Sequence, residues 1–88
     1  MPSRKNREIV QKNFTANLTL ALRARYGKRV SATRVADEFN LRALGTTTVT
    51  RQTALKWMTG HALPDAGRLK VIAEWLDLDL NEIFKSSE

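Results

Sequence analysis

Apolar residues recur every three or four positions along most of this chain, the spacing that places side chains on one face of an α-helix. The first such stretch runs from about residue 7 to residue 26, and Gly27 is expected to end it. Its apolar face collects Val10, Phe14, Leu18, Ala21 and Leu22. We therefore expect a long first helix that packs one side against a core.

Four cations crowd the end of this first helix: Arg23, Arg25, Lys28 and Arg29. The carbonyl end of a helix is electrically negative, so cations are favourable there. This role explains the four residues without any ligand.

A second helix is expected over residues 32–40, with Ser31 as its N-cap. Val35, Ala36 and Phe39 form its narrow buried face. The free N–H groups and positive dipole end at its start are a natural phosphate site.

The segment that follows, residues 41–49, contains Gly45 and three threonines before Val49. Threonine and valine favour extended backbone. We expect a structured loop here. Its first residues either prolong the second helix or fold over it, and a short hairpin is a further possibility.

The most informative stretch is residues 50–60, which predicts a short helix with Thr50 as N-cap and Gly60 as the stop. Its apolar stripe is Ala54, Trp57 and Met58. Its other face carries Arg51, Gln52, Thr53, Leu55 and Lys56. Arginine and glutamine can each make paired hydrogen bonds to base edges, and both lie in the first turn. The competing interpretation is an ordinary solvated helix face.

A fourth helix is expected after the turn at Pro64, with Asp65 as its N-cap. Trp75 lies off the apolar stripe of this helix and is expected to cover the domain edge. The stripe itself is Leu69, Ile72, Ala73 and Leu76. A final short helix follows, with Ile83 and Phe84 apolar.

These patterns predict an all-α fold of five helices with no necessary sheet. With 88 residues, 42% of them hydrophobic, the chain suits one small domain. We expect a basic N-terminal tail at 1–8, a domain at 9–85 and a frayed C-terminus at 86–88.

The net charge of +6 is distributed unevenly. Residues 1–56 carry 12 Lys and Arg against three Asp and Glu, whereas residues 57–88 carry three against six. A basic front and an acidic back suit a domain that presents one face to a polyanion. Solubility alone is the simpler explanation of excess Lys and Arg.

Several classes of function lack support in the sequence. There is no cysteine, and the single histidine, His61, cannot make a zinc site alone. No catalytic arrangement or Gly-rich phosphate loop is specific enough to propose an enzyme, a cofactor or a small-molecule substrate. No apolar run approaches the roughly 18 residues that span a bilayer, and no secretory signal precedes the domain. We expect a cytoplasmic protein without a membrane partner.

Residues 31–84 resemble the lambda-repressor-like DNA-binding domains, the Cro/repressor or XRE-type helix-turn-helix group. The similarity rests on an ordered series of segments: SATRVADEF, VTRQTALKWMTG, LPD, LKVIAEWLDL and LNEIF. It implies a compact five-helix lambda-repressor-like domain whose third helix enters the major groove. One feature departs from the family, in which the second and third helices are joined by a very short turn. Here ten residues, NLRALGTTTV, separate Phe39 from Thr50.

The resemblance implies specific roles. The base-contacting residues would be Arg51, Gln52, Thr53 and Lys56, with Leu55 beside them. The phosphate-contacting residues would be Ser31, Ala32, Thr33, Thr50 and His61, joined by Arg42 if the extended turn projects toward DNA. Members of this family usually bind inverted-repeat operators as homodimers and often repress transcription.

Two other functions remain open from sequence. One is a protein-interaction module of the same fold, such as an antitoxin or anti-repressor, which would use the acidic surface of residues 74–82. The other, RNA binding, lacks exposed aromatic platforms. Trp57 is one potential stacking residue, but its place beside Ala54 and Met58 favours the core.

Overall fold

The computed structural model describes residues 4–85, and these form five α-helices without any strand. The expected all-α fold is confirmed. The hairpin considered for residues 41–49 is absent, because residues 41–42 prolong α2 and the following residues up to 49 form a turn and irregular backbone. The helices are α1 (Arg4–Tyr26), α2 (Ala32–Arg42), α3 (Arg51–Met58), α4 (Ala66–Leu76) and α5 (Leu80–Phe84).

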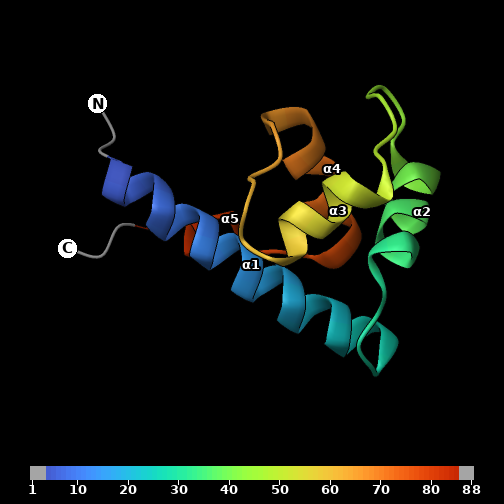
Figure 1. The fold of residues 1–88 in the computed structure, drawn as a ribbon, viewed down its shortest axis with the longest axis horizontal. Helices are drawn as coiled ribbons and strands as arrows, with labels where there is room; N and C mark the ends of the chain where they lie inside the picture. Colours follow the sequence, from blue (N-terminus) through green and yellow to red (C-terminus); the bar gives the residue numbers. More distant parts are fainter. Residues whose placement is uncertain (1–3, 86–88) are drawn as a thin grey trace.

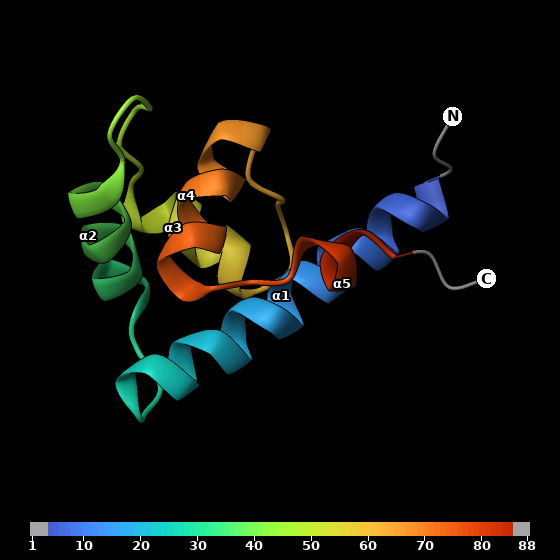
Figure 2. The ribbon, with the colours of Figure 1, turned by 180° about the vertical axis from the view of Figure 1, so that it is seen from behind.

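Helix α1 is the longest helix and runs along one side of the other four (Figure 1). It contacts α3, α4 and α5, while α2 packs against α3 and α4. The N-terminal part of α1 extends beyond α2, α3 and α4, and α5 lies against α1 on that side in the two opposite views (Figure 2). The radius of gyration, 12.6 Å, is close to the roughly 12 Å expected of a compact chain this long.

The predicted helix ends are confirmed in detail. Ser31, Thr50 and Asp65 each accept a hydrogen bond from the backbone N–H three residues ahead, which satisfies a donor that the helix cannot pair internally. Gly27 and Gly60 follow α1 and α3 with φ angles of 72° and 79°. Only glycine adopts such angles without strain, so the two positions end their helices.

The core lies between α1 and the layer formed by α2, α3 and α4. Phe14, Leu18, Phe39, Ala54 and Ile72 are almost completely inaccessible to solvent. Phe39 and Trp57 pack edge to face, with ring centroids 5.4 Å apart. Trp57 is only 2% exposed, so it belongs to the core as expected and is no stacking platform.

Two expectations need correction. Helix α1 begins at Arg4, so residues 4–8 are helical, because no glycine or proline interrupts this stretch. Trp75 is buried at 7% exposure, because α4 packs against both α1 and α2 and its buried face is wider than one stripe. The remaining positions of the expected tail, 1–3, and the expected frayed end, 86–88, lie outside the described residues.

None of the helices in the described part of the chain is both long and apolar enough to cross a membrane.

Candidate nucleic-acid interface

Helix α3 presents a polar surface on a firmly held backbone. Arg51, Gln52, Leu55 and Lys56 are all exposed and follow one another along one side of the helix; we call them the α3 stripe. The opposite side buries Ala54 and Trp57 completely or nearly so. The stripe therefore stands on a helix whose position is fixed by the core, and no other part of residues 4–85 covers it.

The two threonines at the start of α3 differ from the stripe. Thr53 is half-buried, and its hydroxyl oxygen lies 3.3 Å from that of Thr50. The Thr50 hydroxyl also accepts the Thr53 N–H at 3.2 Å. Thr53 thus faces the helix cap more than the solvent, while Thr50 remains exposed beside the first turn.

The connection between α2 and α3 is anchored away from the stripe. The side chain of Asn40 holds the backbone of Val49 through two hydrogen bonds. The side-chain oxygen Oδ1 accepts the Val49 N–H at 2.8 Å, and the side-chain nitrogen Nδ2 donates to the Val49 carbonyl at 3.0 Å. Farther out, Arg68 of α4 donates to the hydroxyl of Thr47. These contacts hold the connection on the α2 and α4 side, so the α3 stripe stays exposed despite the length of the connection.

The start of α2 offers backbone donors. Ser31 and Thr33 are exposed, whereas the side chain of Ala32 is buried at 7% exposure. Ala32 can therefore contribute only its backbone N–H, one of the first-turn donors without a partner inside the helix. The Ser31 hydroxyl is occupied as an acceptor by the N–H of Arg34.

Arg42 is not brought to the stripe. Its Nη1 donates to the Glu38 carboxylate and to the Glu38 carbonyl, each at 2.8 Å, and its guanidinium lies 5.1 Å from the Trp75 ring centroid. The hydrogen bond from Arg42, with the nearby charges of Arg42 and Arg34, holds the pKa of Glu38 below its ordinary value. Arg42 is thus engaged between α2 and α4.

His61 lies at the opposite end of α3 from Thr50. Its side chain is exposed, and its backbone N–H donates to the Lys56 carbonyl at 2.9 Å. The ring Nδ1 lies 2.8 Å from the Thr59 hydroxyl oxygen. The described residues contain no group of three or more His, Asp and Glu side chains placed to hold a metal ion. His61 is therefore a polar side chain at the end of α3, available to a ligand at that surface.

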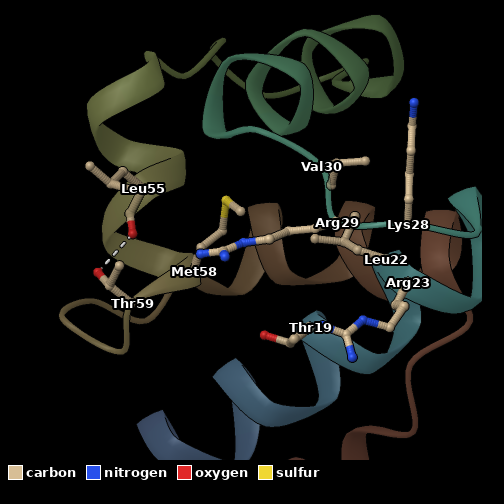
Figure 3. Close-up of a pocket in the computed structure, with 9 residues that line it drawn as sticks. All are labelled: Thr19, Leu22, Arg23, Lys28, Arg29, Val30, Leu55, Met58 and Thr59. Atoms are coloured by element: carbon tan, nitrogen blue, oxygen red, sulfur yellow. Dashed lines mark hydrogen bonds between the residues drawn. The ribbon is translucent and has the colours of Figure 1, made fainter.

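A feature that the sequence analysis did not assign to a site lies beside the stripe (Figure 3). The end of α1, the loop after it and the second half of α3 enclose an open hollow of about 340 Å³, which we call the cationic hollow. Arg29 reaches from the loop toward Met58, and Arg23 lies beside Thr19 on α1. Its lining residues are Thr19, Leu22, Arg23, Lys28, Arg29, Val30, Leu55, Met58 and Thr59.

Acidic residues are absent from the segments that build this surface. Residues 9–36 and 39–64 contain no Asp or Glu at all, although together they carry Lys12 and eight arginines and lysines from Arg23 to Lys56. This gap in the acidic residues is a signal in the sequence that could have indicated the hollow, but the helix dipole accounts equally well for the cations near residue 26. Only folding shows that they adjoin α3.

Comparison of the chain with protein-family models, with curated proteins and with solved structures gives no match.

Proposed function

We propose that this protein is a sequence-specific regulator that binds double-stranded DNA, with α3 in the major groove. The observation that carries the proposal is the α3 stripe: an arginine, a glutamine and a lysine exposed on a helix whose other side is core, in a segment without carboxylates. A major groove accepts one α-helix, and its base edges offer the acceptors and donors that such side chains recognise.

Each residue of the stripe has a distinct role in this proposal. Arg51 donates to the two acceptors of a guanine, and Gln52 pairs with an adenine edge. Lys56, one turn farther along, contacts a further guanine or a phosphate. Leu55 adds an apolar side chain that suits the methyl group of thymine. Thr53 is a weaker candidate, because its hydroxyl faces Thr50.

Phosphate contacts would flank the helix. The backbone N–H groups of residues 31–33 and the exposed side chains of Thr50 and His61 would supply hydrogen bonds to phosphates. Arg42 is excluded from this set unless it leaves Glu38, since the ion pair and the Trp75 ring now hold it.

The wider interpretation follows the resemblance to lambda-repressor-like domains. The order of helices supports it: α2 packs most extensively against α3, as a supporting helix does in a helix-turn-helix. In this interpretation the protein is a homodimeric, cytoplasmic repressor of the XRE type that binds an inverted-repeat operator, and it needs no cofactor.

Selection of bound fragments from random duplex DNA, read by sequencing, tests the proposal. We expect an enriched motif with two half-sites, and we expect the double variant Arg51→Ala/Gln52→Ala to lose that motif while still binding DNA weakly. Lys70→Ala, an exposed lysine on α4, is the matched control and should enrich the wild-type motif. Failure of the wild-type protein to enrich any motif would overturn sequence-specific binding.

An interaction module without an operator is the second candidate, and the exposed acidic residues of α4 and α5 favour it. Glu74, Asp77, Asp79 and Glu82 are all exposed on that side of the molecule. Retention on heparin together with a shift of duplex DNA supports the first proposal. If the protein binds neither, the acidic surface is the better place to look for a partner.

A further inference from the structure

We infer that the cationic hollow seats the sugar–phosphate backbone of the same DNA duplex, as an anchor independent of base sequence. This inference rests on the proposed function and adds a second contact region to the α3 stripe. It gives Arg23, Lys28 and Arg29 a role beyond that of cations at a helix end.

The first argument is charge. Elsewhere, several arginines and lysines in or directly after α2, α4 and α5 form ion pairs: Arg34 and Arg42 with Glu38, Arg68 with Asp65, and Lys85 with Glu82. Among residues 4–85, no carboxylate lies within 4.0 Å of Arg23, Lys28 or Arg29, and all three are exposed. Three uncompensated cations around one hollow attract an anion.

The second argument is the apolar surface at the bottom of the cationic hollow, which we call its floor. Leu22 and Val30 are buried at 4% and 7% exposure, and half-buried Met58 faces them from α3. A bare inorganic anion gains nothing from such a surface. A nucleic-acid backbone alternates anionic phosphates with largely apolar deoxyribose, so it matches both the cations at the rim and the apolar floor.

The third argument is position. Leu55 of α3 and Thr59, the residue that follows α3, form one wall of the hollow, and Leu55 belongs to the α3 stripe. The chain also runs directly from Arg29 and Val30 into the start of α2, where unpaired N–H groups point outward. A helix in the major groove has a phosphate backbone on each side. The hollow lies where one of these strands would pass.

The test compares wild-type protein with Arg23→Gln/Lys28→Gln/Arg29→Gln, on the selected site and on random duplex, over a range of salt concentrations. Binding that depends on phosphate contacts weakens with salt by a log–log slope of about 0.9 per contact. We expect the triple variant to lose about two to three units of slope. We also expect it to weaken on both duplexes equally, so that the ratio between them is unchanged.

The control variant Lys70→Gln/Lys85→Gln removes exposed lysines from α4 and from the end of α5, outside the hollow. It should leave the slope within half a unit of wild type. Because the substituted side chains are exposed, thermal unfolding should confirm that both variants fold like the wild-type protein.

Neutral methylphosphonate linkages, introduced one at a time into the selected duplex, locate the contact. Wild-type binding should fall at a few adjacent linkages of one strand, and the triple variant should be insensitive there. An unchanged salt slope, or unchanged sensitivity at every linkage, would overturn the anchor. These outcomes leave sequence-specific binding intact, whereas a wild-type protein that binds no duplex at all defeats the proposed function itself.

Discussion

Arg51 is the single residue on which base recognition depends most in this proposal. It is exposed in the first turn of α3 and has no carboxylate partner among residues 4–85. We expect Arg51→Ala to weaken binding to the selected site by about 1–3 kcal/mol, mainly through one base position. Gel shifts against single-base variants of the site measure both the loss and its position.

Arg51→Lys separates charge from geometry. Lysine keeps the positive charge but lacks the planar fork that bonds two acceptors at once. Compared with Arg51→Ala, the Arg51→Lys variant should therefore regain most of the affinity for random DNA. It should regain less of the preference for guanine over the other bases at the contacted position. If Arg51→Ala weakens random and selected DNA to the same extent, Arg51 contacts phosphate and the base-reading role is wrong.

At the scale of an element, the long connection between α2 and α3 depends on Asn40. Its side chain pairs with both backbone groups of Val49, which is buried at 8% exposure. Asn40→Ala leaves an N–H and a carbonyl without partners, and each such loss costs about 1–3 kcal/mol. We expect a fall of at least about 1 kcal/mol in the free energy of unfolding, measured by urea denaturation.

Two matched variants refine that expectation. Asn40→Asp keeps the acceptor for the Val49 N–H but loses the donor to its carbonyl, so its stability should fall between wild type and Asn40→Ala. Thr48→Ala changes an exposed side chain of the same connection and should have little effect. Equal stability of Asn40→Ala and Thr48→Ala would show that the connection is not held by Asn40.

Glu38 of α2 has an ion-paired carboxylate, so we expect the stability of the protein to depend on pH. Arg42, and then Arg34, keep the pKa of Glu38 below its ordinary value. The unfolded chain therefore takes up this proton at higher pH than the folded one, and the stabilisation present at neutral pH is lost as pH falls through the range below about 5. Glu38→Gln should destabilise the protein at pH 7 and much less at pH 3.

Urea unfolding at several pH values measures this difference. Glu74→Gln removes an exposed carboxylate of α4 that has no ion pair within residues 4–85, and it provides the control. A constant gap between Glu38→Gln and wild type from pH 7 to pH 3 would mean that the carboxylate acts through packing and not through its charge.

The elements also show which features a sequence can predict. Helix caps at Ser31, Thr50 and Asp65 are local, so their residue types predicted them correctly. Trp57 was predicted in the core because its helix buries one face. Trp75, in contrast, is buried because α4 meets two helices, and periodicity within one helix carries no information about a second neighbour. The cationic hollow escaped prediction for the same reason, since three separate segments enclose it.

At the scale of the whole molecule, exposed apolar side chains bear on the expected homodimer. Phe84 and Leu80 are 50% and 40% exposed on α5, whose neighbour Ile83 is fully buried and anchors the helix to the core. Leu41 and Leu44, at the end of α2 and in the connection, are 75% and 90% exposed and form a rival patch. Exposed apolar area of this kind is a common basis for association between protein chains.

The two patches make opposite predictions for sedimentation. If α5 forms the interface, Phe84→Asp should convert a dimer of the wild-type protein to a monomer, because it places a charge in an apolar contact. Leu44→Asp should then leave the dimer intact. The reverse result would move the interface to the α2 corner. If both variants keep the wild-type mass, neither patch joins two copies, and binding to two half-sites would have to arise from assembly on DNA.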